Sequence, residues 1–279
     1  MDIIKKLAEE LQIRPGQAQA AVKLIDEGNT IPFISRYRKE ATGALNDEVL
    51  RNLYERLNYL RNLEEKKEQV LSSIEEQGKL TEELKKQILA ADPLVAVDDL
   101  YRPYRPKRRT RATIAKEKGL EPLANIIMLQ MTDKPIEEEA QDFVSEEKGV
   151  ETVADAINGA KDIIAEHISD EADYRIYLRK LTMDRGSVAS TAKKPEESSV
   201  YEMYYEIEEP IKKLAGHRVL ALNRGEKEKI LTVKVNAPEE EAMGWLQKQV
   251  ITKENPITKP ILREVVEDSY KRLIAPAIE

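Results

Sequence analysis

The chain has 279 residues and no cysteine, and its 45 Lys and Arg against 52 Asp and Glu give a formal net charge of −7. The missing cysteines exclude disulfides, thiol nucleophiles and thiolate zinc sites, and two histidines are too few for a histidine-rich metal centre. The length is sufficient for one large domain or two smaller ones. No apolar run reaches the roughly 18 residues of a membrane span or resembles a signal peptide, so we expect a cytoplasmic protein without membrane contact.

The composition is typical of a helical, well-solvated protein, with 35% charged and 5% aromatic residues. Charge is unevenly distributed along the chain. Residues 1–131 carry 23 cationic and 21 anionic side chains, whereas residues 132–279 carry 22 and 31. We therefore expect a mainly α fold with a helical domain at 1–131 and an acidic helical region at 132–279. The negative charge argues against a polyanionic partner for the second region only.

The first elements form a predicted trihelical unit. Apolar residues at helical spacing from Ile3 to Leu11 predict one helix, and Pro15 begins a second that ends near Gly28. A third helix is expected over 30–39, so that the pair around the Gly28-Asn29 turn resembles a helix-turn-helix in its spacing. Its apolar and aromatic residues are expected to pack in the core (Ile31, Phe33, Ile34 and Tyr37). Its last cations are candidates for nucleic-acid binding (Arg36, Arg38 and Lys39).

A long helix is predicted over about 47–77, because this stretch contains neither Gly nor Pro and keeps an apolar stripe from Leu50 to Ile74. At 1.5 Å per residue it would extend about 45 Å. A helix of that length is a spine on which other elements pack.

The segment 101–111 contains six cations and no anion. Pro103 and Pro106 disfavour a helix and predict an extended course. The cations are candidate phosphate ligands, and the two tyrosines are candidates for stacking on bases; together these residues are Tyr101, Arg102, Tyr104, Arg105, Lys107, Arg108, Arg109 and Arg111. In the alternative interpretation the segment is an internal strap whose cations pair with acids of the long helix (Glu64, Glu65, Glu75 or Glu76). Cations that face solvent would favour the first interpretation, and cations paired with the long helix the second.

The second half begins with acidic helices, one of them expected from about 150 to 181. The polar stretch 185–199 is predicted to be a loop. Two β-prone runs, 218–223 and 230–235, flank a Gly-containing loop and predict a β-hairpin at about 218–235. A final helix is expected over about 257–274.

Signatures of common enzyme classes are missing from the sequence. We find no Gly-rich phosphate loop, dinucleotide fingerprint, His-Glu-x-x-His motif or nucleophile elbow. Neighbouring acids such as Glu239–Glu241 diverge around a helix, and His167 and His217 are expected to have structural or surface roles. The sequence therefore predicts a non-enzymatic protein with no catalytic residue, metal or cofactor.

Four separated motifs resemble the Tex family of bacterial transcription accessory proteins. They are 31–40 with Thr42-Gly43, 99–112, 119–124 and 217–226. In that family a helical N-terminal region precedes an RNase-H-like domain, helix-hairpin-helix elements and an OB-type RNA-binding domain, none of which is visible here. The resemblance implies that the chain is the N-terminal part of a longer protein.

The functional hypothesis follows from the resemblance and the cationic segments together. We expect a non-enzymatic N-terminal module of a Tex-like protein that scaffolds and contributes to binding RNA or DNA, with the transcription machinery as a further partner. The alternative is a protein–protein interaction scaffold with no nucleic-acid contact of its own.

Overall fold

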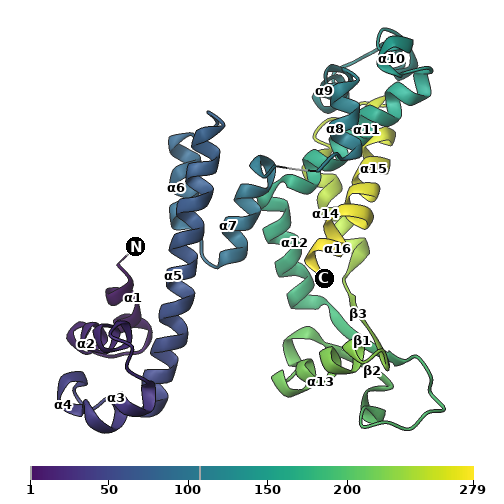
Figure 1. The fold of residues 1–279 in the computed structure, drawn as a ribbon. Helices are drawn as coiled ribbons and strands as arrows, with labels where there is room; N and C mark the ends of the chain where they lie inside the picture. The colour runs from purple at the N-terminus through teal and green to yellow at the C-terminus, as the bar shows by residue number, and fades with distance from the viewer. Residues whose placement is uncertain (1, 107) are drawn as a thin grey trace. The chain divides into compact units, whose positions relative to one another are not determined.

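The computed structural model describes residues 2–106 and 108–279 and confirms the mainly α fold (Figure 1). The chain divides into two compact units, one ending at Tyr101 and the other comprising Arg102–Glu279. Each unit has its own hydrophobic core. Within the described part of the chain, no helix combines the length and the apolar character that crossing a bilayer requires.

The first unit is built on the predicted spine helix, α5 (Asp47–Glu76), whose extent confirms the expectation. Asn46 caps it by accepting a hydrogen bond from the backbone N–H of Val49. The apolar stripe is buried along its whole length (Leu50, Leu53, Leu57, Leu60, Leu63, Val70 and Ile74). Five helices of this unit pack along α5: α1 (Ile3–Glu10), α2 (Pro15–Asp26), α3 (Ile31–Tyr37), α6 (Glu82–Ala90) and α7 (Leu94–Tyr101). The short α4 (Lys39–Thr42) packs on α2 and α3.

Two ion pairs fasten α1 and α2 to the spine helix. The Arg56 guanidinium donates to both carboxylate oxygens of Glu10, at 2.5 and 2.8 Å. Arg61 binds Asp26 in the same two-pronged way, at 2.8 and 2.9 Å. These hydrogen bonds are the main reason that the pKa values of Glu10 and Asp26 lie below their ordinary values of 4.5 and 3.8, with burial acting in the opposite direction.

The two pairs predict an acid-sensitive first unit. A pKa that is lower in the folded state means that the unfolded chain binds more protons. The stabilisation by these two ion pairs is therefore complete at pH values above the ordinary pKa values of Glu10 and Asp26. It is lost as the pH falls through their pKa values in the folded protein. Urea unfolding across an acidic pH series should show a shallower pH dependence for Arg56→Gln/Arg61→Gln than for the native chain. Arg51→Gln, which removes an exposed pair within α5, is the matched control; parallel profiles for native and double variant would contradict the prediction.

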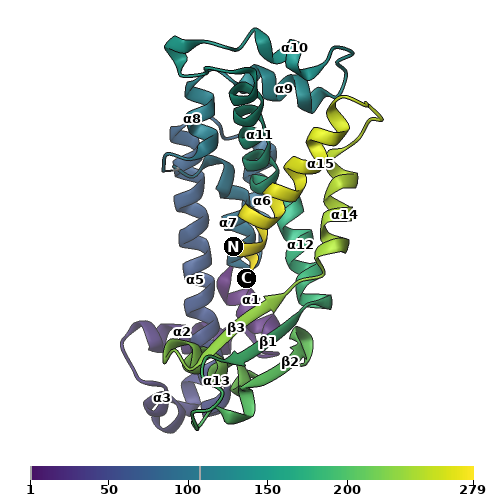
Figure 2. The same ribbon diagram turned by 90° about the vertical axis from the view of Figure 1, so that its right-hand side faces the viewer.

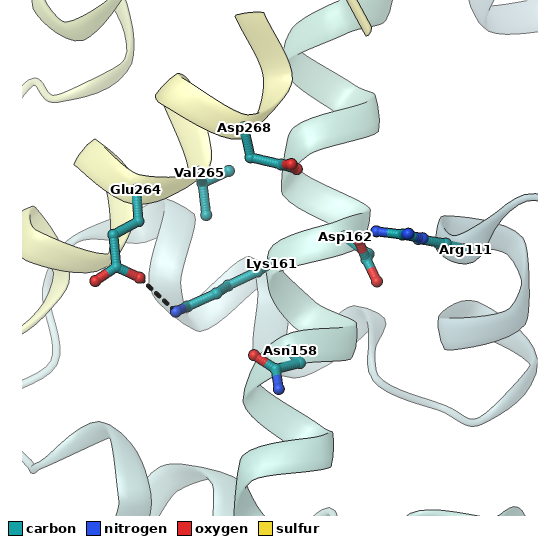
Figure 3. Close-up of a pocket in the computed structure, with 7 residues that line it drawn as sticks. All are labelled: Arg111, Asn158, Lys161, Asp162, Glu264, Val265 and Asp268. Carbon is teal, nitrogen blue, oxygen red and sulfur yellow. Dashed lines mark hydrogen bonds and ion pairs between the residues drawn. The ribbon is translucent and has the colours of Figure 1, made fainter. Parts of the chain in front are cut away.

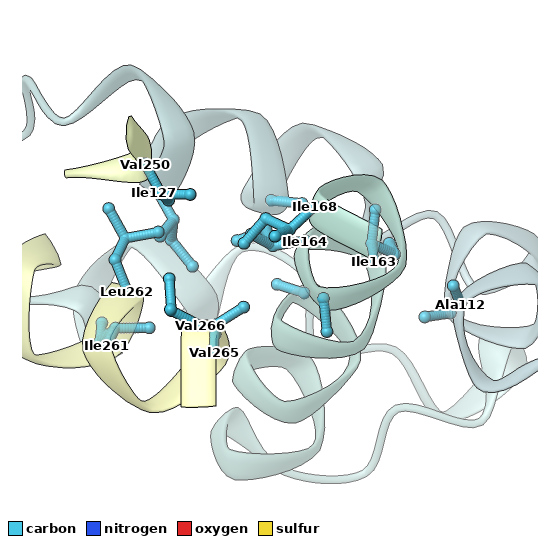
Figure 4. Close-up of a cluster of buried hydrophobic side chains, with 14 of the residues drawn as sticks. Ala112, Ile127, Ile163, Ile164, Ile168, Val250, Ile261, Leu262, Val265 and Val266 are labelled. Carbon is cyan, nitrogen blue, oxygen red and sulfur yellow. The ribbon is translucent and has the colours of Figure 1, made fainter. Parts of the chain in front are cut away.

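The core of the second unit surrounds α11 (Val153–Asp170), which packs against α8 (Arg111–Glu117), α9 (Glu121–Leu129) and α15 (Thr258–Asp268). Isoleucines of α11 interlock with valines of α15 and with Ile127 of α9 (Figure 4). The remaining α-helices of the unit are α10 (Ile136–Gln141), α12 (Ala172–Arg185), α13 (Gly216–Lys227), α14 (Glu239–Val250) and α16 (Ala275–Ile278). The unit also contains a π-helical turn (Ser269–Ile274) and short 3-10 turns at Arg102–Tyr104, Glu146–Lys148, Glu202–Tyr204 and Ile211–Lys213.

The boundary between the two compact units, after Tyr101, lies well before the change in charge at residue 131. The reason is that α8 and α9 bury Ala112, Ala115, Leu123 and Ile127 in the second core. Divided at Tyr101, the sequence carries 15 cationic and 19 anionic side chains before the boundary and 30 and 33 after it. The charge asymmetry along the sequence is therefore not a difference between the folded units.

A three-stranded antiparallel sheet in the order β2-β1-β3 belongs to the second unit (Figure 2). Its strands are β1 (Ser187–Ala192), β2 (Glu206–Pro210) and β3 (Leu231–Asn236). Only β3 was predicted. The polar stretch expected to be a loop contains β1, where Val188 and Ser190 take the buried positions. A serine at a buried position hides the period-two alternation that indicates a strand.

The predicted hairpin at 218–235 is wrong, because its first run lies within α13. Four consecutive apolar residues, 219–222, provide no strand alternation, and Leu and Ala are strong helix formers. As a helix, the segment places Leu222 and Gly225 on one buried face. A Cβ atom at Gly225 would lie 2.6 Å from Leu231, so the glycine allows α13 to pack closely on β3.

Candidate nucleic-acid interface

The basic segment is more helical than expected. Tyr101 ends α7, Arg102–Tyr104 form a 3-10 turn, and Arg111 begins α8. Thr110 caps α8 by accepting a hydrogen bond from the backbone N–H of Thr113 at 3.0 Å. The predicted extended course is thus wrong for 101–104, since a proline is tolerated in a first helical turn. Lys107 lies outside the described residues.

The residues at the start of the segment make structural contacts. The Tyr101 hydroxyl lies 2.9 Å from the Ser73 hydroxyl on α5, and Tyr101 is half-buried. Arg102 donates to the Asp170 carboxylate on α11 at 3.1 Å, where Asp170 is largely buried. This ion pair does not involve the glutamates proposed for the internal strap. Tyr101 and Arg102 thus anchor the segment, and Tyr104 is half-buried as well.

The later cations face solvent. Arg105, Arg108 and Arg109 are exposed. Arg109 pairs with Glu117 on α8 at 3.2 Å, but the side chains are 71% and 60% exposed, so solvent screens the pair strongly. Arg108 forms no ion pair with any described residue. The exposed loop cations of this segment are therefore Arg105, Arg108 and Arg109.

Arg111 differs, because it borders a pocket of about 270 Å³ that contains acids (Figure 3). Asp162 of α11 and Asp268 of α15 lie beside it, and both carboxylates contact Arg272. Burial raises the pKa of Asp162, while the positive charges of Arg272 and Arg111 oppose that shift. Two nearby carboxylates would repel a phosphate, so Arg111 is the weakest of the exposed candidates.

The second predicted cluster lies where α3 meets α4. We call Arg36–Ala41 the α3–α4 corner; its side chains line a hollow of about 450 Å³. The backbone turns at Arg38, where φ is −126° and α3 gives way to α4. Arg36, Arg38 and Lys39 are all exposed, and within the described chain none of the three forms an ion pair. The corner is a concave surface on the first unit that carries three cations and one exposed acid, Glu40.

Tyr37 was expected to pack in the core, and that prediction is wrong. Its side chain is 67% exposed, because α3 has only seven residues and buries Ile34 instead. The ring packs against Phe33 with centroids 5.4 Å apart, and the Arg38 guanidinium lies 5.3 Å from the Phe33 centroid. Tyr37 thus adds an exposed aromatic ring to the corner. Its place one turn beyond Ile34 at the end of a short helix was the only signal in the sequence.

The helix-turn-helix interpretation stays a prediction. Gln17 of α2 donates to the carbonyls of Thr42 and Gly43 at 3.2 and 3.1 Å and so fastens α4 to α2. Gly43 is in the left-handed conformation that a glycine adopts without strain.

Among the described residues, no three His, Asp or Glu side chains gather closely enough to hold a metal ion.

The fold is that of a mainly helical protein, and comparisons with known proteins identify its family. The model of the Tex-like protein N-terminal domain matches residues 1–75, and that of the Tex central region-like family matches 131–278. The chain therefore belongs to the Tex family, as its motifs predicted.

Individual relatives agree with this assignment. The chain is 48% identical over 278 residues to the uncharacterized protein YdcI of Bacillus subtilis, covering 99% of this chain and 39% of the relative. It is 42% identical over 235 residues to the transcriptional accessory protein Tex of Neisseria gonorrhoeae, covering 84% and 31%. It is 31% identical over 293 residues to the human S1 RNA-binding domain-containing protein 1, covering 99% and 29%. The chain thus spans about two fifths or less of the length of each.

Proposed function

We propose that this chain is a non-enzymatic module of a Tex-like transcription accessory protein. The module serves as a scaffold and contributes contacts to RNA or DNA through the α3–α4 corner. One observation carries the proposal: Tyr37 is 67% exposed among three exposed cations that have no ion pair in the described part of the chain. A folded protein gains little stability from such an arrangement, whereas a nucleic acid matches both of its features.

The chemistry of the corner suits a polyanion with aromatic bases. Arg36, Arg38 and Lys39 supply charge-assisted hydrogen bonds to phosphate oxygens. The exposed face of Tyr37 offers a surface on which a base can stack, which is worth about 1–3 kcal/mol per base. The exposed loop cations Arg105, Arg108 and Arg109 are a second, separate phosphate-binding candidate on the other unit.

The printed names of the relatives support the proposal at the level of the family. The Neisseria relative is named a transcriptional accessory protein, and the human relative is named for an S1 RNA-binding domain. Because the chain spans less than a third of either, their activities enter here only as part of the proposal.

Charge reversal tests the corner directly. The variant Arg36→Glu/Arg38→Glu/Lys39→Glu is expected to weaken binding of labelled single-stranded and duplex RNA and DNA about tenfold or more at low salt. Loss of each phosphate contact should also reduce the slope of log K against log salt by about 1. Fluorescence anisotropy over a salt series measures both quantities.

Two further variants make that result specific. Lys79→Glu/Lys85→Glu/Lys86→Glu changes the net charge equally at exposed positions of the first unit and should leave binding nearly unchanged. Arg105→Glu/Arg108→Glu/Arg109→Glu tests the loop, and unaltered affinity would remove those residues from the interface. If both the corner and the loop variants bind like the native chain, the nucleic-acid proposal fails and the scaffold alternative stands.

A further inference from the structure

A second basic surface lies around α13, in a segment that no predicted site includes. Residues 212–234 carry seven cationic and two anionic side chains in a chain of net charge −7. Two of these cations form ion pairs: Arg218 with Glu209, and Lys212 with Asp184. The other five are exposed and form no ion pair with any described residue (Lys213, Arg224, Lys227, Lys229 and Lys234).

Apolar surface accompanies this charge. Leu220, on the outer face of α13, is 72% exposed, although Leu222 two positions later is buried. Between α13 and the sheet lies a groove of about 440 Å³. Its polar border is formed by Asn223, Glu226, Lys234 and Glu279. Six apolar side chains line the rest of it (Val188, Leu214, Val219, Leu222, Val233 and Val235). We call Leu220, this groove and the five cations the α13 surface.

We propose that the α13 surface binds an acidic protein segment that carries at least one large apolar side chain. The apolar side chain would occupy the groove, and flanking carboxylates would meet Arg224, Lys227 and Lys234. Apolar area surrounded by charge is the usual anatomy of a protein–protein interface, and complementary charge favours the correct partner and speeds association.

The apolar component distinguishes this partner from a nucleic acid. Phosphates would satisfy the cations but would leave the valine-lined groove and Leu220 facing water. A peptide with leucine or isoleucine between acids satisfies both. The inference concerns different residues from the α3–α4 corner, so either proposal can fail without the other.

A random peptide display library selected on the whole chain tests the inference. The expected result is enrichment of peptides that combine Asp or Glu with Leu, Ile or Phe. The most enriched peptide, synthesised with a fluorescent label, should bind Leu220→Ser and Arg224→Glu/Lys227→Glu at least about tenfold more weakly than the native chain, since a few interface residues dominate affinity.

Matched variants on α6 supply the controls. Leu89→Ser removes a leucine that is 51% exposed, and Lys85→Glu/Lys86→Glu reverses two exposed charges; neither should change the affinity. The inference is overturned if no peptide is enriched, if the enriched peptides lack acids or apolar residues, or if the α13 variants bind them as well as the native chain. Displacement of the peptide from the α13 surface by a single-stranded oligonucleotide would assign the surface to nucleic acid instead.

Discussion

Replacing Ile164 with alanine is expected to lower the free energy of unfolding of the second unit by about 2–5 kcal/mol. Ile164 is 1% exposed and lies at the centre of the core between α11, α9 and α15 (Figure 4). The substitution removes apolar atoms from water-free surroundings and leaves a cavity among side chains held by several helices, so the site has little room to collapse.

The sole tryptophan measures this effect selectively. Trp245 belongs to the second unit, where its ring stacks on that of Tyr177 with the ring centroids 3.9 Å apart. Because it is the sole tryptophan, its fluorescence during urea unfolding reports on that unit. Ile176→Ala is the matched control: Ile176 is 43% exposed on α12, and its loss should change stability by no more than about 0.5 kcal/mol. Equal losses for the two variants would show that Ile164 is not part of a packed core.

Gly186→Ala is expected to destabilise the same unit by about 1–3 kcal/mol, although it adds a single methyl group. Gly186 joins α12 to β1. A Cβ atom there would lie 2.4 Å from the carbonyl oxygen of Thr182 and 3.1 Å from that of Asn236. Both oxygens belong to the backbone, so the clash cannot be relieved by a side-chain rotation and must displace either the helix end or β3.

Gly244→Ala is expected to have the opposite effect on stability. Gly244 lies inside α14, and a Cβ atom there would have no neighbour within 4 Å. Alanine at that position should stabilise the helix by about 0.5–1 kcal/mol. Thermal unfolding followed by far-ultraviolet circular dichroism compares the two variants. A Gly186→Ala protein as stable as the native chain would mean that the junction between α12 and β1 tolerates a side chain.

The sequence was sufficient to predict elements whose signals are local. The spine helix has a cap at Asn46, no internal Gly or Pro and an apolar stripe from Leu50 to Ile74, and all three features are local in sequence. The sheet was predicted poorly because β1 pairs with strands distant in sequence and places Ser190 at a buried position. The error at α13 is of another kind, because the local signals already favoured a helix: residues 219–222 are consecutively apolar without strand alternation, and Leu and Ala are strong helix formers.

The sequence was sufficient to find the charged residues of the candidate site, but not to tell which of them are exposed to solvent. The cations of 101–111 were evident in the sequence. The ion pair of Arg102 with Asp170, however, joins residues far apart in sequence and engages that arginine inside the protein. The acids beside Arg111 come from α11 and α15, so their closeness to Arg111 could not be predicted from the sequence either. Tyr37 shows the reverse case, since a residue assigned to the core is exposed because its helix ends there.

The length of α5 also determines how far apart contacts on the first unit lie. The α3–α4 corner adjoins the beginning of this helix, and the Tyr101 hydroxyl contacts Ser73 near its end. At 1.5 Å per residue these two positions are about 40 Å apart. Duplex DNA advances 3.4 Å per base pair, so about twelve base pairs are needed to bridge them. A shorter duplex aligned with α5 would therefore reach only one end of the helix.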